Sequence, residues 1–314
     1  MSSPAHTHVS APDAATTPVA GLTARRVIPL RHPGRWLATV VVLVVLAQVV
    51  HGLVTNRFYQ WDRFAYWFFE PVVLDGLLIT LYVTAISAVL ALIGGTVLAL
   101  ARHSRSPVPR AVSWTYIWLF RSVPLVVVLL FLYNFSALYQ SLSLGVPFGP
   151  SFITFGVTAL ATETVIAVIG LTLHESAYAA EIVRAGILSV DQGQHEAAAS
   201  LGIPRYRQFR RIVLPQALRS IVPNYVNLVI GLVKSTSLVF YVSLLDLFGT
   251  VQSLGSTYPG DIIPLLLVAT VWYVILTSVI SVVQYYVERR FAQGATRNPP
   301  PTPFQRLRGL AVRR

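Results

Sequence analysis

Long hydrophobic runs alternate with short polar segments along most of the chain. Each run holds about 20 mainly apolar residues, and a helix of that length rises about 30 Å, the thickness of the hydrocarbon core of a bilayer. The pattern therefore predicts an all-α membrane protein with six transmembrane helices. They are expected at residues 36–54, 76–101, 111–138, 164–187, 221–241 and 263–287.

Two segments depart from this regular pattern. Arg121 and Pro124 interrupt the third run. Residues 139–162 are apolar, but two glycines and two prolines between positions 145 and 150 break them up. Such residues are typical of turns, so we expect a loop or a surface-lying hairpin at 139–162.

The arginines predict how the helices are oriented. Charged residues make up 11% of the chain, against about 25% in soluble domains. The formal net charge is nevertheless +12, and it is concentrated in alternate links and both tails, as expected for cytoplasmic segments. A compact basic patch for nucleic acid is not indicated. The basic segments are 25–35, 102–110, 184–219 and 289–314.

The first run has two interpretations. A cleaved signal peptide is one, but no small-x-small cleavage site follows the run closely, and a five-span chain would place a basic tail outside. We therefore expect an extra N-terminal span at 36–54, with cytoplasmic tails at 1–35 and 291–314. The chain has no cysteine, which excludes disulfides, thiolate metal sites and cysteine nucleophiles.

The polar segment between the fourth and fifth runs has the pattern of a helix, a turn and a second helix. Residues 196–200 favour a helix, Gly202 is a typical helix stop, and Pro204 can begin the next turn. An ordinary topology-setting loop would explain the four arginines at 205–211, but it would not explain this spacing. The segment therefore predicts a short, rigid docking helix on the cytoplasmic face.

This spacing resembles a signature of the permease subunits of binding-protein-dependent ABC importers. The signature reads E-A-A, three residues, G, nine residues, I-x-L-P. It implies a type-1 importer core over residues 70–290, with residues 188–220 as its coupling loop and Arg205 within it. The matching positions are Glu196, Ala197, Ala198, Gly202, Ile212, Leu214 and Pro215.

Other segments resemble the polar amino acid branch of this family, which serves histidine, arginine, glutamate, glutamine and opine uptake. Ser235 departs from that branch, where many members have an acid after the lysine, and His174 and Glu175 also vary. The particular substrate therefore stays open. The similar segments are 76–87, 120–124, 171–187 and 234–238.

The resemblance also implies partners and a mechanism. Two permease chains, identical or paralogous, would form the pathway, and two cytosolic ATPases holding ATP and Mg²⁺ would lie beneath them. An extracytoplasmic solute-binding protein would deliver the solute, and the spans would rock between inward- and outward-facing states. The helix at 196–202 would enter a groove in the ATPase. This places the chain in the cytoplasmic membrane of a prokaryote.

The chain carries no nucleotide-binding or catalytic motif of its own. G-x-x-x-x-G-K-[ST] is absent, and residues 231–236 lack the glycine that precedes the lysine. H-E-x-x-H and G-x-S-x-G are also absent. We therefore expect a permease without enzyme activity, metal or cofactor of its own.

Charged residues within the spans are candidates for a solute pathway, because a charge at membrane depth costs about 2.5–3.5 kcal/mol. Lys234 would contact a substrate carboxylate in one interpretation. In the other it pairs with Glu163 or Asp246, or extends to the outer surface. Glu175 and Glu163 are the acidic candidates, although Glu163 also suits a helix start, where the dipole favours an acid.

Polar side chains at helical spacing form a stripe on the second span. Thr84 shares a face with Thr80 and Ser87, and the stripe either lines the pathway or holds helices together. Arg121 lies near the cytoplasmic edge, where it would pair with an acid, meet a lipid phosphate or line the pathway.

Two other classes of protein fit parts of the pattern. A secondary transporter would show inverted repeats and intramembrane carboxylates, but no clear repeat is present and the docking signature would have no purpose. A sensor or scaffold would use the loop for another partner and would need no solute path.

Overall fold

The computed structural model describes residues 33–146, 149–156 and 162–292. The predicted tails at 1–35 and 291–314 lie almost wholly outside these residues. The chain divides into two compact units, residues 1–56 and residues 57–314.

The described part of the first unit contains helix α1 (Pro33–Thr55). Residues 36–55 are long and apolar enough to cross a membrane, and none of them is buried within the chain. The helix covers the predicted first span. Its apolar side chains are therefore available to lipid or to a partner.

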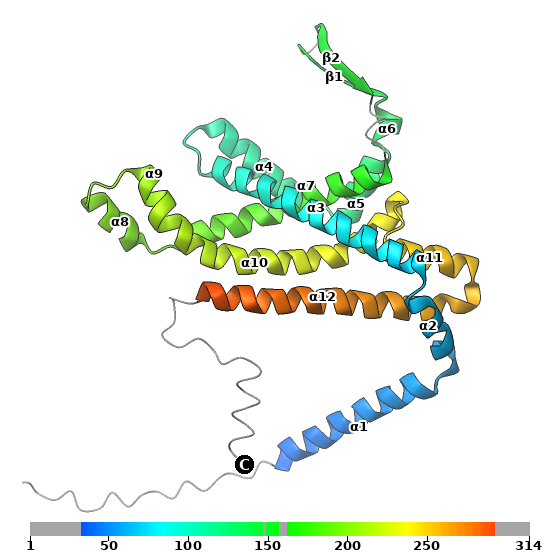
Figure 1. The fold of residues 1–314 in the computed structure, drawn as a ribbon. Helices are drawn as coiled ribbons and strands as arrows, with labels where there is room; N and C mark the ends of the chain where they lie inside the picture. Colours follow the sequence, from blue (N-terminus) through cyan, green and yellow to red (C-terminus); the bar gives the residue numbers. More distant parts are fainter. Residues whose placement is uncertain (1–32, 147–148, 157–161, 293–314) are drawn as a thin grey trace, which may run out of the picture. The chain divides into compact units, whose positions relative to one another are not determined.

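Four long helices form most of the second unit (Figure 1). They cover the predicted second, fourth and sixth spans in full and the fifth as far as Ser235, after which the 3-10 segment η4 holds residues 236–241. The fifth begins earlier than expected, at Leu214 rather than Ile221, because Pro215 suits the first turn of a helix. The helices are α3 (Pro71–Arg102), α7 (Glu163–Leu188), α10 (Leu214–Ser235) and α12 (Ile262–Ala292).

The third span, predicted at 111–138, is not one straight helix. It consists of α4 (Pro107–Ser122), α5 (Leu125–Tyr133) and the short α6 (Phe135–Leu138), and α4 and α5 meet at an angle of 101°. The cause is Pro124, which lacks an N–H and disfavours a helical conformation in the residue before it. The described residues thus hold five membrane-length helices, or six if the bent pair crosses as one span.

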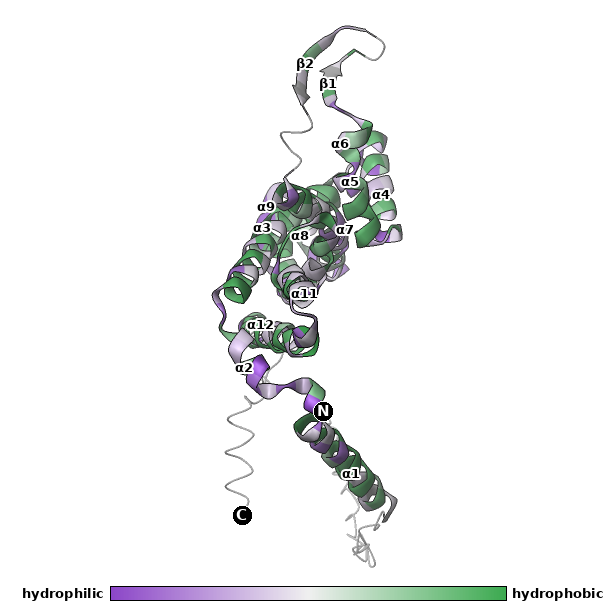
Figure 2. Cartoon of the chain, turned by 90° about the vertical axis from the view of Figure 1, so that its right-hand side faces the viewer, coloured by the Kyte–Doolittle hydropathy of each residue, from purple (hydrophilic) through white to green (hydrophobic). Residues whose placement is uncertain are grey.

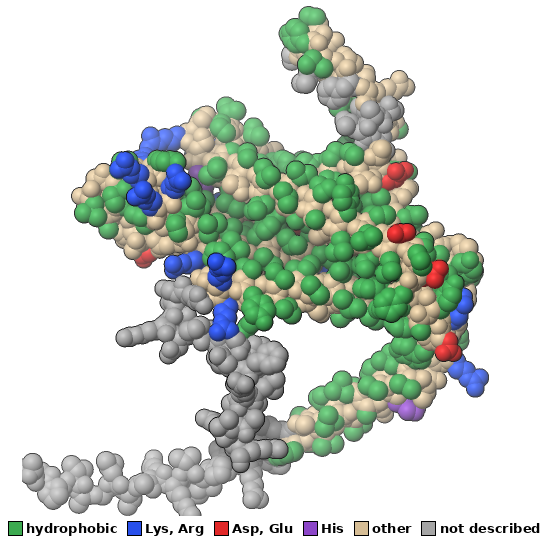
Figure 3. Space-filling view, viewed as in Figure 1, with side chains coloured by type: hydrophobic (Ala, Val, Ile, Leu, Met, Phe, Trp, Pro, Cys, Tyr) green, Lys and Arg blue, Asp and Glu red, His purple; other side chains and the backbone are tan. Residues whose placement is uncertain are grey.

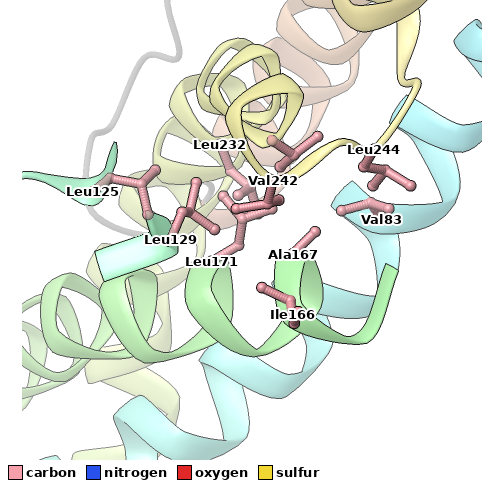
Figure 4. Close-up of a cluster of buried hydrophobic side chains, with 10 residues drawn as sticks. Val83, Leu125, Leu129, Ile166, Ala167, Leu171, Leu232, Val242 and Leu244 are labelled. Atoms are coloured by element: carbon pink, nitrogen blue, oxygen red, sulfur yellow. The ribbon is translucent and has the colours of Figure 1, made fainter. Parts of the chain in front are cut away.

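The central core lies where α3, α5, α7 and α10 meet (Figure 4). Leu129, Leu171 and Leu232 are almost completely buried there. Lipid tails are as apolar as leucine, so close packing rather than escape from water holds such helices together.

A β-hairpin follows α6. Strand β1 (Ser141–Gly145) pairs antiparallel with β2 (Ser151–Gly156), and Ser141 lies opposite Gly156. The hairpin interpretation of 139–162 is therefore confirmed for the described residues of that segment.

Short helices lie at the two ends of the long ones (Figure 1). α8 (Gln192–Ser200) and α9 (Arg205–Gln208) are at one end, and α2 (Trp61–Phe68) and α11 (Leu247–Thr257) are at the other. The remaining helical segments are η1 (Arg57–Tyr59), η3 (Phe209–Val213), η4 (Thr236–Val242) and η5 (Pro259–Asp261).

Surface chemistry differs between the middle of the long helices and their ends. Hydrophobic residues predominate along the long helices (Figure 2). On the face seen in Figure 3, Lys and Arg side chains gather around α8, α9 and the neighbouring helix ends, whereas Asp and Glu lie mainly at the opposite end. This is the charge asymmetry that the sequence predicted for the two sides of a membrane.

Candidate coupling loop and solute pathway

Helix α8 has a defined start and a defined stop. The Asp191 carboxylate caps it by accepting a hydrogen bond from the Gly193 N–H at 2.7 Å. At the other end, the Gly202 N–H donates to the Ala199 carbonyl and the Ile203 N–H to the Ala198 carbonyl, both at 3.0 Å. This is the Schellman arrangement, which needs a left-handed residue after the helix. Gly202 supplies it, with φ +65°.

The chain then turns back through α9 into α10. Gln208 Nε2 lies 2.9 Å from His195 Nδ1 and ties α9 to α8. The π-helical η3 follows and ends directly before α10. Pro215 has no N–H to donate to the carbonyl four residues earlier, and a wider turn accommodates this loss. The loop is therefore held by its own hydrogen bonds.

The loop is anchored to the long helices by small and branched residues. Val213, Ala217 and Ile221 are buried against Val183 and Ala99. The close contact depends on Gly186, because a Cβ added there would lie 2.3 Å from an Ile221 side-chain carbon. The end of the loop and the first half of α10 therefore pack tightly against α7.

The residues of the predicted signature differ in their exposure. Glu196, Ala197, Gly202, Arg205 and Pro215 are exposed, and Ile212 and Leu214 are half-buried. Ala198 differs from its neighbours, because it is 2% exposed and packs inside the chain. The exposed part of the signature thus lies mainly on the outer face of α8 and at the glycine corner.

Lys234 lies near the end of α10 and lines a cavity of about 390 Å³. Its side chain is exposed, and no ion pair involves it among the residues that the structure describes. The Asp246 carboxylate is instead hydrogen-bonded to Gly249 and Tyr273. The other lining residues are Ser237, Phe248, Thr270, Tyr273, Val274 and Thr277.

The remaining pathway candidates lie in different settings. Glu175 is 5% exposed, and its Oε1 is 3.3 Å from His174 Nδ1. Thr84 is also 5% exposed, and its hydroxyl has no hydrogen-bond partner among the described residues. Glu163 is exposed in the first turn of α7. The structure therefore buries two of these candidates inside the chain and leaves Lys234 and Glu163 accessible.

The stripe on the second span proves to be internal. Thr80 and Ser87 are completely buried. Thr80 Oγ1 accepts a hydrogen bond from the Leu247 N–H at 3.0 Å and lies 3.4 Å from an Asp246 carboxylate oxygen. Thr80 thus joins α3 to the start of α11, as the helix-joining interpretation predicted for that position.

Sequence reasoning missed the role of Asp246. The residue caps α11 by accepting a hydrogen bond from the Gly249 N–H at 2.9 Å, and the Tyr273 hydroxyl donates to it at 3.2 Å. An aspartate directly before an apolar segment is an N-cap signal, so the sequence alone could have predicted that Asp246 caps α11. The sequence could not have predicted its contacts with α3 and α12.

An ion pair joins α2 to the start of α12. Both carboxylate oxygens of Asp261 accept hydrogen bonds from Arg63, with Nε at 3.0 and 2.9 Å, and Trp67 Nε1 donates at 2.9 Å. The hydrogen bond from Arg63 to Asp261 raises the pKa of the guanidinium above its usual value. The described residues contain no group of His, Asp and Glu side chains suited to a metal ion.

Five of the described helices are long and apolar enough to span a membrane, and an exposed helix–glycine corner lies in the link between α7 and α10. Residues 91–293 match the family model described as "Binding-protein-dependent transport system inner membrane component". The chain belongs to this family, as the signature at 196–215 predicted. ATP hydrolysis in such transporters is carried out by the separate ATPase subunit.

Similar proteins handle amino acids. The chain is 40% identical over 272 residues to the arginine transport system permease protein ArgU of Corynebacterium glutamicum, covering 86% of this chain and 84% of that protein. It is 34% identical over 226 residues to the glutamate/aspartate import permease protein GltK of Escherichia coli O6:H1, covering 71% and 94% of the two chains.

A solved structure supports the fold. The crystal structure of an amino acid ABC transporter with histidines aligns with a TM-score of 0.60 and 30% identity, covering 70% of this chain and 94% of that chain. The predicted class, an all-α importer permease of the type-1 fold, is confirmed.

Proposed function

We propose that this chain imports polar amino acids across the cytoplasmic membrane of a prokaryote, and that α8 couples it to a cytosolic ATPase. The observation that carries the coupling is the exposed corner formed by α8 and Gly202, which its own hydrogen bonds hold rigid. The likeness to amino acid permeases, among them an arginine permease at 40% identity, supports the substrate class.

The signature residues have distinct roles in this proposal. Glu196 and Arg205 supply opposite charges to the groove of the ATPase, and exposed Ala197 lets the two backbones approach closely. Ala198 is buried and does not meet the ATPase; its small side chain allows α8 to lie close to the rest of the loop. Ile212, Leu214 and Pro215 join the loop to α10, so that a shift of α8 becomes a shift of a membrane helix.

The working assembly requires further subunits. Two ATPases bind ATP and Mg²⁺, a second permease completes the pathway, and a solute-binding protein delivers the amino acid. Closure of the ATPases carries α8 with it and rocks the helices as rigid bodies. The basic end around α8 and α9 faces the cytoplasm, together with both termini, in agreement with the positive-inside rule.

Lys234 is the proposed contact for the substrate. Every amino acid carries an α-carboxylate, so a cation in the cavity between α10 and α12 serves cationic and acidic substrates alike. Glu163 is the accessible acid for a cationic side chain. Glu175 and Thr84 are buried, so they act on the pathway through the packing of α7 and α3.

Co-purification from native membranes tests the coupling. We expect the ATPase to accompany the tagged wild-type permease and to be lost with Gly202→Asp, which forces a side chain into a left-handed corner and adds charge to the docking surface. Gly260→Asp is the matched control, because it lies at the opposite end of the long helices with no atom within 4 Å of an added Cβ. An ATPase retained by both variants would contradict the proposal.

Uptake by the reconstituted complex tests the substrate class. We expect ATP-dependent import of labelled arginine or another polar amino acid, with KM raised at least about tenfold in Lys234→Gln, since a charged hydrogen bond contributes about 1.5–3 kcal/mol. Lys234→Arg keeps the charge and should stay near wild type. Equal KM values for wild type and Lys234→Gln would rule out the carboxylate contact but not the substrate class.

A further inference from the structure

A second cavity, of about 450 Å³, lies between α3, α4 and α7, and arginines line it. Arg102 ends α3, Arg184 is in the last turns of α7, and Arg121 is at the end of α4. We call this cavity the basic pocket. The other lining residues are Trp114, Ile117, Trp118, Ser122 and Glu181.

The pocket carries more positive than negative charge. Glu181 accepts from Arg102 at 2.6 Å and from Arg184 at 2.7 and 2.9 Å, so one carboxylate serves two guanidinium groups. Arg121 lies 5.4 Å above the Tyr178 ring and forms no ion pair within the described part of the chain. Three arginines against one glutamate leave a net charge of +2. This net charge favours an anion in the pocket.

The position of the pocket points to a lipid. Two of its arginines stand near the ends of α3 and α7, on the side of α8. Trp114 and Trp118 stack with centroids 6.3 Å apart and are about half exposed, at 54% and 56%. Exposed tryptophans are typical of the headgroup level of a membrane. A phosphate at that depth is most abundant on the lipids themselves.

A separate apolar groove is lined by residues of α4, α5 and α7, some of them close in sequence to those of the basic pocket. It has a volume of about 370 Å³ and is lined by apolar side chains alone, including Leu119, Phe120 and Leu173. Leu119 and Phe120 adjoin Trp118 and Arg121 in sequence. Leu173 precedes Glu181 by about two turns of α7, or about 12 Å along the helix. A charged head and an apolar tail would thus find adjoining sites.

We propose that the basic pocket binds the phosphate of an acidic phospholipid from the leaflet on the side of α8, with an acyl chain in the apolar groove. Arg121 and the free hydrogen-bonding capacity of Arg102 and Arg184 hold the phosphate, and the two tryptophans flank the headgroup. Basic pockets between transmembrane helices suit such headgroups. The site is separate from the coupling corner and from the Lys234 cavity, so it stands independently of the substrate.

Lipid retention by the purified complex tests this site. The complex is titrated with phosphatidylglycerol or phosphatidylcholine carrying the same acyl chains, and bound lipid is measured by native mass spectrometry. We expect preferential retention of phosphatidylglycerol, and about fivefold weaker retention in Arg121→Gln, the effect of one arginine near the membrane surface. Arg110→Gln is the matched control, because Arg110 is exposed on the same helix outside the pocket; its retention should fall clearly less than that of Arg121→Gln.

Further arms of the experiment separate the alternatives. Arg121→Lys keeps the charge and should retain the lipid, which excludes simple misfolding as the cause of a loss. Equal retention of the two lipids, or an equal loss in Arg110→Gln, would overturn the proposal. Displacement by millimolar inorganic phosphate would reassign the pocket to a free anion. Lipid bound by the isolated permease but absent from the assembled complex would show that the second permease covers it.

Discussion

At the residue scale, buried polar groups in this chain are stabilised by neighbours that are distant in sequence. Asp246 is completely buried. Its carboxylate caps α11 through Gly249, accepts from Tyr273 on α12 and lies near Thr80 on α3. One side chain therefore holds three helices, and a buried polar group left without such partners would be costly.

Removing this carboxylate should destabilise the protein. We expect Asp246→Ala to lower the free energy of unfolding by about 1–3 kcal/mol, because the helix cap is lost and the Tyr273 hydroxyl loses its acceptor. Asp246→Asn keeps an oxygen at the cap and should cost less. Thermal unfolding in detergent measures both. Equal midpoints for wild type and Asp246→Ala would show that the network contributes nothing.

At the element scale, the contact between α3 and α7 depends on the absence of a side chain. A Cβ added at Gly95 would lie 2.5 Å from the Ala179 Cβ and 2.8 Å from the Ala180 nitrogen. Neither neighbour can move without shifting the backbone of α7. Small residues of this kind let membrane helices pack closely.

Replacing glycine by alanine should therefore have opposite effects on stability at Gly95 and at Gly231. Gly95→Ala should lower stability by about 1–3 kcal/mol, the typical cost of overpacking. Gly231→Ala, in α10, meets no atom within 4 Å and should be neutral or stabilising, because alanine favours a helix by about 1 kcal/mol over glycine. Chemical denaturation of the purified variants compares them. A stable Gly95→Ala protein would mean that α3 and α7 are less closely packed than described.

At the same scale, the third predicted span shows what the pattern of apolar residues could not predict. The apolar run at 111–138 predicted one span, yet Pro124 divides it into helices that meet at 101°. Proline marked the position of the break, but it could not give the angle, because the packing of α4 and α5 against α7 decides that. For 139–162 the sequence predicted a loop or a hairpin, because glycine and proline favour turns locally, and the structure decided for a hairpin.

At the scale of the whole molecule, charge separates the two ends of the long helices. Basic residues gather at the end with α8 and α9, and acidic residues lie mainly at the end with α2 and α11 (Figure 3). The membrane potential and anionic lipids favour basic segments on the cytoplasmic side. The coupling corner must lie on that side to meet a cytosolic ATPase.

Cysteine labelling measures this orientation directly, because the chain contains no cysteine of its own. We expect Ser151→Cys in the hairpin and Ser256→Cys in α11 to react with a membrane-impermeant maleimide in intact spheroplasts. Ser200→Cys, at the end of α8, should react only in inside-out vesicles. The unmodified chain is the blank, and the reverse pattern of labelling would overturn the proposed orientation.

The sequence by itself determined the features that depend on local spacing. Runs of membrane length predicted most of the spans, arginine-rich links predicted the basic end, and the 196–215 signature predicted the family and the short helix before Gly202. Only the tertiary structure decided which polar residues meet. Thr80 contacts Leu247 across 167 positions, and Arg102 contacts Glu181 across 79. Such contacts depend on how helices pack against one another, and the period of a single helix does not contain that information.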